Sequence, residues 1–418
     1  MKYKAPRGTQ DILPEQTIHW TKIKKTFRSV MARFGAEEII TPSFEETEIF
    51  IRGVGETSDI VTKEMYTFED KGGRSLTLRP EGTAPVVRAY LEHNLAQTRP
   101  VPVKLFYIGP MFRYERPQAG RYRQHTQYGI EIFGSSSPYI DAELISIALL
   151  FYKELGIEGL EPEINSVGCP ECRKPHRELL TSYLNKRKSS LCNDCSGRIE
   201  KNPLRVFDCK NQECQDQLSG APTIVDNLCE KCKNHFDIVQ KQLTNLGITF
   251  TLNPRLVRGL DYYTHTAFEI TASGLGAQKT VCGGGRYDGL VETLGGPSTP
   301  AIGFGAGIER LMLVLENQGK LPAEPIRPDV AFICPNEDSI PAATRLMKEI
   351  RDNGFYCECD FEGRSFKKQF QKANKLNAKY TAIIGEDELS AGTVTLKNMA
   401  TGEQSVIKQS ELLTEFKG

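Results

Sequence analysis

The stretch from Lys104 to Gly134, KLFYIGPMFRYERPQAGRYRQHTQYGIEIFG, consists of two runs of alternating apolar residues around the polar loop ERPQAG. Alternation with a period of two is typical of β-strands, and two such runs around a short polar loop predict an antiparallel hairpin. The hairpin limits the fold to those that contain an antiparallel sheet. Its interior is unusually charged for a purely structural element, since it includes Arg113 and Glu131.

Helices are predicted on both sides of the hairpin. Before it, apolar residues recur at three- and four-residue spacing, as in an amphipathic helix that Gly35 ends: Ile23, Phe27, Val30, Met31 and Phe34. After it, DAELISIALLFYKELG predicts a helix with Asp141 as its N-cap and Gly156 as its end. Pro42 interrupts a short β-prone run and suits a strand end or a sheet edge.

The chain changes character twice. From about residue 168 to 247 it is rich in cysteine and lysine with few strand signals, which predicts an inserted module. The proline-rich stretch KLPAEPIRPDV then predicts a linker to a small α/β domain in which strand and helix patterns alternate. We therefore expect four segments, at residues 1–167, 168–247, 248–322 and 323–418.

Charge and composition exclude little. Lys plus Arg and Asp plus Glu both number 53, so any nucleic-acid surface must be local. No signal peptide and no apolar run of about 20 residues is present, which predicts a cytoplasmic protein without a membrane span. In that compartment the 12 cysteines are expected to be thiols or metal ligands rather than disulfides.

Eight of these cysteines form four closely spaced pairs. The first two pairs fit the C-x₂-C-x₁₅₋₂₀-C-x₂-C spacing of zinc sites. Two structural Cys₄ zinc sites and a metal-free thiol cluster are equally favoured, and the sequence leaves the combination of the pairs open. The eight candidate ligands are Cys169, Cys172, Cys192, Cys195, Cys209, Cys214, Cys229 and Cys232.

The common phosphate-binding motifs are absent. No P-loop occurs, and GFGAGIER fails the pattern G-x-G-x-x-G because Ile308 stands at the third glycine position. Arginines stand instead beside strand ends and glycines, namely Arg113, Arg258 and Arg310. A guanidinium grips phosphate oxygens in two places, so these three could bind a polyphosphate, although single arginines are usually surface charges.

Carboxylates accompany the arginines. Residues four apart on a strand point to the same face, so Gln127 and Glu131 can line one cavity, and Glu81 lies in the polar run TLRPEGTAP. Such a set would hold a zwitterionic or cationic small molecule beside a polyanion. Composition alone favours the alternative of surface salt bridges, which stabilise little.

Five motifs resemble a known family. MFRYE with RYRQ, the Pro42 segment and GFGAGIERL resemble the three signatures of class II aminoacyl-tRNA synthetases, and LVRGLDYYT and GGGRYDGL resemble the two stretches peculiar to histidyl-tRNA synthetases. The resemblance implies an α+β fold, with an antiparallel sheet flanked by helices, the Cys-rich helical insertion, and a C-terminal α/β anticodon-binding domain. It also implies a homodimer that binds L-histidine, ATP with Mg²⁺, and the histidine tRNA.

The resemblance also implies roles for individual residues. Catalysis would depend on Arg258 and Arg113. ATP would contact Arg113, Glu115 and Arg310. Histidine would be bound by Glu81, Gly82, Thr83, Gln127, Glu131, Arg258, Tyr262 and Tyr263. His125 stands where an aromatic residue is expected to stack on adenine, and Asp261 and His265 have no implied role.

Two further predictions concern tRNA. Arg116 and Gln118 in the hairpin loop would reach the acceptor end. Residues 364–379 carry six basic residues and no acid, and a helix would place them on one face, so Lys368, Lys372 and Lys375 would follow phosphates. The simpler interpretation is a solvated helix face. For the whole chain, the alternative to a ligase is a non-catalytic regulatory subunit of histidine biosynthesis with the same fold.

Overall fold

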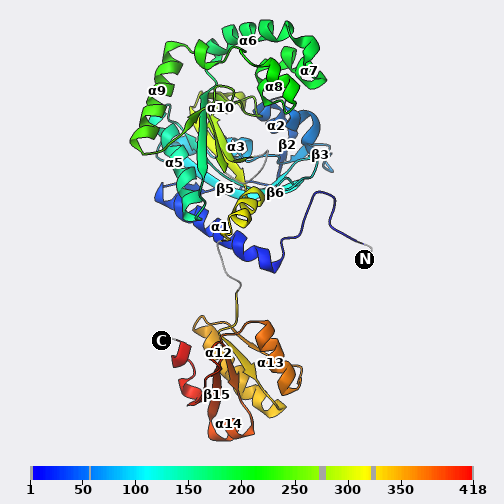
Figure 1. The fold of residues 1–418 in the computed structure, drawn as a ribbon, viewed down its shortest axis with the longest axis vertical. Helices are drawn as coiled ribbons and strands as arrows, with labels where there is room; N and C mark the ends of the chain where they lie inside the picture. The colour runs from blue at the N-terminus through cyan, green and yellow to red at the C-terminus, as the bar shows by residue number, and fades with distance from the viewer. Residues whose placement is uncertain (1–2, 56–57, 273–278, 322–325, 417–418) are drawn as a thin grey trace. The chain divides into compact units, whose positions relative to one another are not determined.

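The structure is a computed structural model that describes residues 3–55, 58–272, 279–321 and 326–416. It divides into two compact units, residues 1–323 and 324–418 (Figure 1). The boundary predicted between residues 322 and 323 lies outside the described residues, and the other segment bounds stay predictions. Among the described helices, none combines the length and the apolar character that a membrane span requires.

An eight-stranded sheet organises the first unit, in the order β1-β5-β6-β11-β10-β9-β7-β8. Its strands are β1 (Glu37–Glu38), β5 (Val103–Phe112), β6 (Gln124–Phe133), β7 (Leu160–Ser166), β8 (Thr251–Leu252), β9 (Thr264–Ala272), β10 (Thr280–Arg286) and β11 (Ala301–Gly307). Neighbouring strands are antiparallel except at the edges, where β1 pairs with β5 and β8 with β7 in parallel. The predicted hairpin is confirmed as β5 and β6, with Leu105 opposite Glu131.

Helices cover one face of this sheet (Figure 1). They are α1 (Pro14–Arg33), α5 (Pro138–Glu154), α9 (Glu230–Asn245) and α11 (Ile308–Asn317). The predicted apolar stripe of α1 is confirmed, since Ile23, Phe27 and Val30 are almost fully buried, and the helix ends just before Gly35, whose φ is 68°. Phe27 contacts Phe106 of β5 and Tyr128 of β6 edge to face. These contacts fix the helical layer against the hairpin.

The other face of the sheet is only partly covered. Several short helices and a three-stranded antiparallel sheet of order β2-β4-β3 lie on this side or beside it. The elements are β2 (Phe44–Glu46), α2 (Thr47–Val54), the π-helix Ile60–Glu64, β3 (Tyr66–Glu69), β4 (Ser75–Leu78), α3 (Thr83–Glu92), α4 (Leu95–Thr98) and α10 (Leu290–Thr293). The polar side chains of β6 and the glycines of β10 and β11 remain between them.

The prediction that Asp141 caps α5 is wrong. The helix begins at Pro138, three residues before Asp141, because the fixed φ of proline suits the first helical turn. Ser137 is the N-cap. Asp141 is fully buried and forms an ion pair of 2.6 Å with the fully buried Arg286. Its role is therefore to compensate a buried cation of β10.

The Cys-rich segment is helical, as predicted, but it is not a separate hydrophobic unit. It contains α6 (Pro170–Asn185), α7 (Asn193–Lys201), α8 (Gln212–Gln217) and α9, with 3₁₀ turns at Lys188–Ser190, Pro203–Asp208 and Val225–Asn227. α6, α7 and α8 surround their own small core. By contrast, Phe236, Val239 and Leu243 of α9 belong to the main core beneath the large sheet.

The second unit has the predicted α/β pattern. Its sheet has the order β13-β12-β14-β15-β16, with β12 parallel to β13 and β14. The elements are β12 (Val330–Ile333), α12 (Ile340–Asp352), β13 (Cys357–Cys359), α13 (Phe366–Lys375), β14 (Tyr380–Ile383), α14 (Glu386–Ala391), β15 (Thr393–Asn398) and β16 (Gln404–Lys408), with 3₁₀ turns at Glu337–Ser339, Gln409–Glu411 and Thr414–Phe416.

The basic helix is shorter than predicted. α13 ends at Lys375, and Asn377 has a φ of 53°, which stops the helix before Lys379. Arg364 also lies outside it. The prediction that all six basic residues lie along one face of a single helix is therefore wrong.

Candidate active site

Glu81 lies directly before α3 and caps its first turn. Its two carboxylate oxygens accept hydrogen bonds from the backbone N–H groups of Thr83, at 2.7 Å, and Ala84, at 2.8 Å. The side chain is almost fully buried, and burial raises the pKa of Glu81, although the two N–H donors lower it. In the sequence EGTAP, the N–H groups at the start of α3 thus fix the position of the Glu81 carboxyl beside the sheet.

Glu131 of β6 is the second fixed acid. The Thr83 hydroxyl donates to its Oε1 at 2.8 Å, and the Tyr287 hydroxyl donates to its Oε2 at 2.5 Å. Glu131 is 1% exposed, and burial raises its pKa to about 8 despite these two hydrogen bonds. At neutral pH the carboxyl is therefore mostly protonated and can both donate and accept.

Glycines of β11 make room for these side chains. Gly303 pairs with Glu131 across the strands, and a Cβ at Gly303 would lie 1.8 Å from Glu131 Oε2. A Cβ at Gly305 would lie 2.0 Å from Gln127 Nε2. The glycine run of β11 therefore serves as a flat floor over which the carboxyl and the amide lie.

Phenols surround this floor. Tyr262 lies 4.8 Å from Tyr263 and 5.6 Å from Tyr287 between ring centroids. Within the described residues, the buried Tyr107 hydroxyl and Gln127 Oε1 have no hydrogen-bond partner. Because unpaired buried polar atoms are costly, these two are places where a bound polar molecule can complete the hydrogen bonding.

The structure thus gathers Glu81, Thr83, Gln127, Glu131 and Tyr263, which come from three separate parts of the sequence. Tyr107 and Tyr287 belong to the same group and were missed by the sequence analysis. Tyr287 lies within the motif GGGRYDGL, so that motif could have identified it. Tyr107 faces Gly129 in the hairpin register, so the alternation of the hairpin could have identified it.

Arg258 lies over β10 at the edge of this group. A Cβ at Gly283 would lie within 2.5 Å of its guanidinium nitrogens, so only glycine leaves room for it there. Arg258 forms an ion pair with Glu269 of β9. Although burial lowers the pKa of Arg258, the negative charge of Glu269 raises it above its usual value, so the cation is permanent.

Glu269 also connects Arg258 to a second cation. The Thr280 hydroxyl donates to Glu269 Oε2 at 2.5 Å, and Arg310 Nε donates to the Thr280 carbonyl oxygen at 3.2 Å. Arg258 and Arg310 are therefore arranged along one edge of β10. Burial and the nearby Arg121 lower the pKa of Arg310.

The loop end of the hairpin carries further charges. Arg113 Nε donates to the Pro80 carbonyl oxygen at 2.7 Å, and its Nη1 lies 3.8 Å from Glu115. Glu115 also pairs with Arg121 at 3.5 Å. His125 is nearby, and burial together with the charge of Arg113 lowers its pKa to about 3, so the imidazole is neutral. This end thus offers cations that are only partly compensated.

The residues predicted to contact tRNA lie in two places, in the loop between β5 and β6 and on α13. Arg116 and Gln118 are exposed in the hairpin loop, where Gln118 and Arg121 exchange backbone hydrogen bonds. On α13, Lys368 and Lys375 are exposed and have no ion-pair partner among the described residues. Lys372 is half-buried and donates to the Cys359 carbonyl oxygen at 3.1 Å.

Asp261 and His265 now have structural contacts. Asp261 accepts a hydrogen bond of 2.8 Å from Asn202 at the end of α7. His265 has a φ of 49°, which is uncommon for a residue other than glycine, and its Nδ1 lies 3.6 Å from the sulfur of Cys232. Both residues therefore connect the motif LVRGLDYYTH to the Cys-rich segment.

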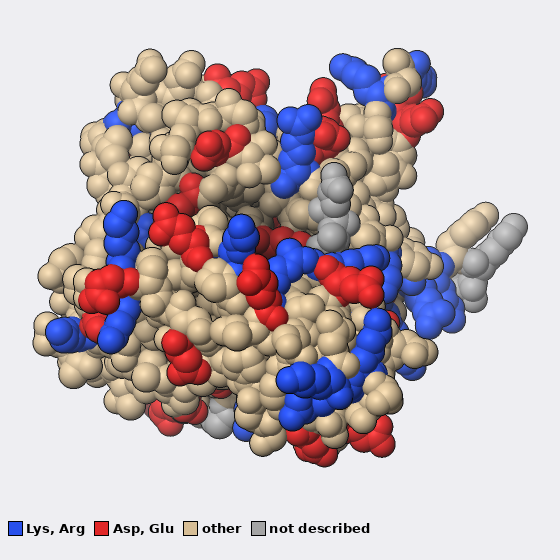
Figure 2. All heavy atoms as spheres, turned by 90° about the horizontal axis from the view of Figure 1, so that it is seen from above, with Lys and Arg blue, Asp and Glu red and all other residues tan. Residues whose placement is uncertain are grey.

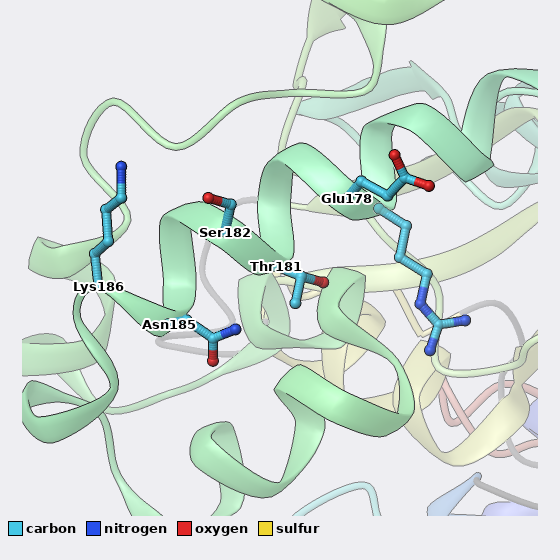
Figure 3. A pocket seen from close by; sticks show the side chains of 6 residues that line it. Glu178, Thr181, Ser182, Asn185 and Lys186 are labelled. Carbon is cyan, nitrogen blue, oxygen red and sulfur yellow. The ribbon is translucent and has the colours of Figure 1, made fainter.

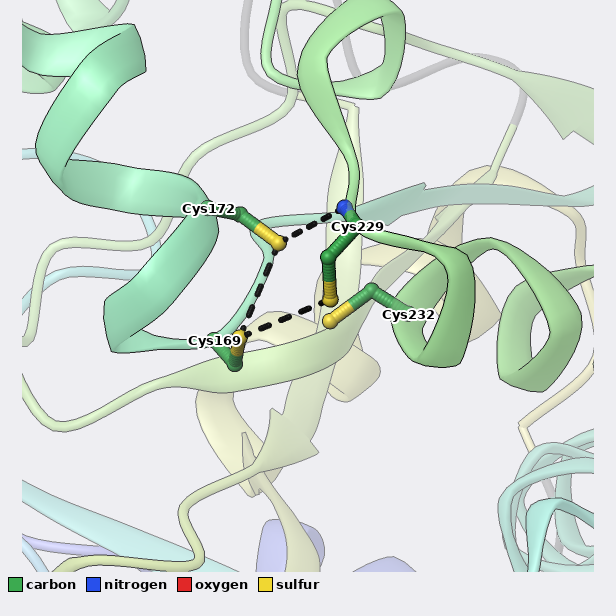
Figure 4. Close-up of side chains that lie close together, drawn as sticks. All are labelled: Cys169, Cys172, Cys229 and Cys232. Atoms are coloured by element: carbon green, nitrogen blue, oxygen red, sulfur yellow. Dashed lines mark hydrogen bonds between the residues drawn. The ribbon is translucent and has the colours of Figure 1, made fainter.

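The eight paired cysteines form two groups of four. Sulfur cluster 1 comprises Cys169, Cys172, Cys229 and Cys232 (Figure 4), and sulfur cluster 2 comprises Cys192, Cys195, Cys209 and Cys214. The first pair of the sequence thus combines with the fourth, and the second with the third. Within each cluster, the four sulfur atoms lie within 4.8 Å of one another.

The sulfur spacing discriminates between a disulfide and a metal site. Measured Sγ to Sγ distances are 3.6 Å and 3.9 Å in cluster 1 and 3.9 Å in cluster 2. A disulfide would require about 2.05 Å. Tetrahedral zinc with Zn–S bonds of about 2.3 Å separates its sulfurs by about 3.8 Å. The residues therefore fit a tetrahedral thiolate site.

Two hollows lie on the Cys-rich segment. One of about 740 Å³ runs along the outer side of α6 and is lined by Glu178, Ser182, Lys186 and their neighbours (Figure 3). It contains none of the predicted site residues. The other, of about 270 Å³, reaches Arg258 and Tyr263. Figure 2 shows basic and acidic side chains interspersed on the face that it draws, in keeping with the balanced composition.

Comparison with known proteins agrees with this architecture. A family model described as "Histidyl-tRNA synthetase" matches residues 8–170 and 210–311, and one described as "Anticodon binding domain" matches residues 329–418. The histidine–tRNA ligase of Clostridioides difficile (strain 630) is 51% identical over 419 residues, covering 100% of this chain and 99% of that protein. That of Halothermothrix orenii is 52% identical over 418 residues, with the same coverage.

A solved structure extends the likeness to the whole fold. The apo histidyl-tRNA synthetase of S. aureus is 40% identical and superposes with a TM-score of 0.84, with 100% of each chain covered. The fold class implied by the sequence motifs is thereby confirmed. This chain belongs to the histidyl-tRNA synthetase family.

Proposed function

We propose that the chain is a histidine–tRNA ligase, which activates L-histidine with ATP and transfers it to the 3′ end of its tRNA. The observation that carries this proposal is the buried carboxyl of Glu131, held between Thr83 and Tyr287 beside unpaired polar atoms. The full-length relatives named histidine–tRNA ligases support it over the non-catalytic regulatory subunit.

Histidine recognition would use both ring nitrogens. An imidazole has one donor and one acceptor nitrogen, so Glu131 on one side and Tyr263 on the other can satisfy both. Glu81, with Gly82, Thr83 and Gln127, would bind the α-ammonium group. The oxygens of Glu81 each accept one backbone hydrogen bond and retain a free lone pair for it. An amino acid without these ring nitrogens would leave buried polar groups unpaired.

The chemical step would depend on fixed positive charge. Arg258 would lie across the histidine carboxylate and the α-phosphate as the carboxylate oxygen attacks phosphorus and pyrophosphate leaves. Arg113 and Glu115 would contact the α-phosphate and adenine, and Arg310 the γ-phosphate. Mg²⁺ would neutralise phosphate charge when it is bound with ATP. Since the arginines are held by protein contacts before the substrates bind, they need little reorganisation during the reaction.

Recognition of tRNA would use both units. Arg116 and Gln118 are exposed in the loop between β5 and β6, where the acceptor end must reach the adenylate. The exposed lysines of α13 would contact phosphates, in agreement with the anticodon-binding description that matches this unit.

Zinc would occupy both sulfur clusters as a structural ion. The sulfur distances support this assignment, as do backbone N–H groups that point at the sulfurs. The Cys229 N–H lies 3.0 Å from Cys172 Sγ, and the Cys192 N–H lies 3.2 Å from Cys214 Sγ. Such donors stabilise thiolates. Metal analysis of protein purified without chelator should find about two zinc ions per chain, and clearly less than one would refute the assignment.

A homodimer is also proposed, through the edge of the large sheet. Among the described strands β1 pairs with β5 alone, and Ile40, two residues after β1, is 83% exposed; Val101, two residues before β5, is 56% exposed. Exposed apolar groups next to an open strand edge are typical of an interface. Analytical ultracentrifugation would test this proposal, and a monomer at micromolar concentration would refute it. The cytoplasmic location stays a prediction.

Pyrophosphate exchange tests the central proposal. With the purified chain, Mg²⁺ and ATP, exchange should depend on histidine and not on any other amino acid tested separately. Exchange with none of the amino acids, together with folded protein, would favour the regulatory subunit instead. Charging of the histidine tRNA under the same conditions tests the second step.

A further inference from the structure

Sulfur cluster 1 lies at the beginning of two helices that both contact the start of β9, which Tyr263 directly precedes. Cys169 directly precedes α6, and Cys229 directly precedes α9, as Figure 4 shows. The two helices are 60 residues apart along the chain when counted between these cysteines. The four sulfurs, with the Cys229 N–H that points at Cys172 Sγ, bring their first turns together at this point.

The α6 side holds the backbone of Tyr263. Arg173 follows Cys172 directly, and its Nη2 donates a hydrogen bond to the Tyr263 carbonyl oxygen. Its Nε donates at 2.9 Å to the carbonyl oxygen of Val167. The guanidinium therefore fastens the end of β7 and the residue before β9 to the same turn of α6.

The α9 side contacts His265 directly and Thr266 through Asp141. Cys232 Sγ lies 3.6 Å from His265 Nδ1, and the left-handed backbone of His265 allows its N–H to donate to the Gly168 carbonyl oxygen at 3.0 Å. One turn further along α9, His235 lies 2.8 Å from Asp141, which also accepts a hydrogen bond of 2.6 Å from Thr266.

The segment Tyr263–His265 is thus held by two turns that contain cysteines of cluster 1, Tyr263 by α6 and His265 by α9. By contrast, Arg258 is held by Glu269 of β9, and Arg310 by Thr280 of β10. Among the described residues, the side chains proposed to bind the nucleotide form no hydrogen bond or ion pair with the first turns of α6 and α9. Loss of the metal would therefore act on Tyr263 directly, and on Arg258 only through the Tyr263 ring, whose centroid lies 5.8 Å from the guanidinium carbon.

We infer that a metal ion at sulfur cluster 1 fixes the position of Tyr263 and so sets the affinity of the site for histidine. This inference rests on the proposed function, because it assigns Tyr263 to the imidazole. Cluster 1 is a positioning site, since its metal does not contact the substrates. It makes histidine binding dependent on zinc and on reduced thiols, while ATP binding is independent of both.

The test uses Arg173→Met, which removes the hydrogen bonds to Tyr263 and Val167 without changing a cysteine. Arg177→Met is the matched control, because Arg177 lies one turn later on α6 and, within the described part of the chain, its hydrogen bonds go to the carbonyl oxygens of Glu200 and Lys201 rather than to Tyr263 or Val167. Equilibrium dialysis of histidine against the full chain, without ATP, gives the dissociation constant. Zinc content and thermal unfolding are measured for the same samples.

Arg173→Met should weaken histidine binding about tenfold, the effect of one lost hydrogen bond, while the zinc content and the KM for ATP stay as in the wild type. Arg177→Met should bind histidine as the wild type does. Equal histidine affinity in the two variants would overturn the inference, even if both sulfur clusters hold zinc.

Cys232→Ser provides the second measurement. It should lose one zinc ion of the two and weaken histidine binding by at least as much as Arg173→Met. Retention of wild-type histidine affinity after loss of that zinc would overturn the inference. A wild-type chain that binds zinc but no histidine would instead contradict the proposed function, so the two failures are distinguishable.

Discussion

Replacement of Gly303 by alanine tests whether Glu131 forms the histidine pocket. The added Cβ would lie 1.8 Å from Glu131 Oε2 and 2.6 Å from the Ile130 carbonyl oxygen, both well inside normal contact. The backbone of β6 is fixed by its ladder with β5 and β11, so the carboxyl must move. That movement breaks its hydrogen bonds to Thr83 and Tyr287.

The magnitude follows from these two hydrogen bonds. Each is worth about 1 to 1.5 kcal/mol net, so the displaced carboxyl loses about 2 to 3 kcal/mol of positioning. If the imidazole binds to this carboxyl, that loss corresponds to histidine binding weaker by about 30- to 150-fold. The free energy of unfolding should also fall by about 1 to 3 kcal/mol because of overpacking.

Pyrophosphate exchange at varied histidine and varied ATP separates the effects. Gly303→Ala should raise the KM for histidine strongly and leave that for ATP nearly unchanged. Gly289→Ala is the control, because this residue has a φ of −92° and nothing within 4 Å of a built Cβ. A KM for histidine within threefold of the Gly289→Ala value, in folded protein, would refute the placement of the imidazole at Glu131.

Three other changes have defined outcomes. Because burial raises the pKa of Glu131 to about 8, the folded state retains a proton that the unfolded state releases near pH 4.5. The unfolding free energy of the wild type, measured by urea unfolding and compared with that of Glu131→Gln, should therefore fall by a few kcal/mol between about pH 4.5 and 8. Asp141→Asn leaves a fully buried Arg286 without its counter-charge and should lower the unfolding free energy by about 3 to 5 kcal/mol in the same assay. Charge reversal on α13 should weaken tRNA binding and flatten its dependence on salt in filter binding, while pyrophosphate exchange is retained; the changes are Lys368→Glu, Lys372→Glu and Lys375→Glu.

Local periodicity correctly predicted the helices and strands whose buried face is set by the spacing of their own apolar residues. The apolar stripe of α1 and the alternation of β5 and β6 follow from burial of one face of each element, and the spacing of apolar residues in the sequence predicts which face that is. The same alternation placed Gln127 and Glu131 on one side of the sheet. The glycines opposite them could be read only once β11 was known to pair with β6.

Long-range partners could not be predicted in this way. Asp141 has the residue type and spacing of a helix cap, and its real partner Arg286 lies 145 residues later in the chain. Three of the four cysteine pairs share the spacing C-x₂-C, so only the fold decides that Cys172 joins Cys229 rather than Cys192. The length of α13 was overestimated because charge periodicity continues past the point where Asn377 adopts a left-handed conformation.

The state of the charged groups without substrate has one physical cause. In a site this buried, each charge must be neutralised or paired, so Glu131 retains a proton and Arg258 pairs with Glu269. A zwitterionic amino acid bound with ATP would bring opposite charges into the site. These charges would replace both the proton on Glu131 and the pairing of Arg258 with Glu269. An amino acid with an apolar side chain would supply the ammonium and carboxylate groups but no partner for Glu131. The same burial that protonates this carboxyl therefore makes the site selective for a side chain that can exchange hydrogen bonds with it.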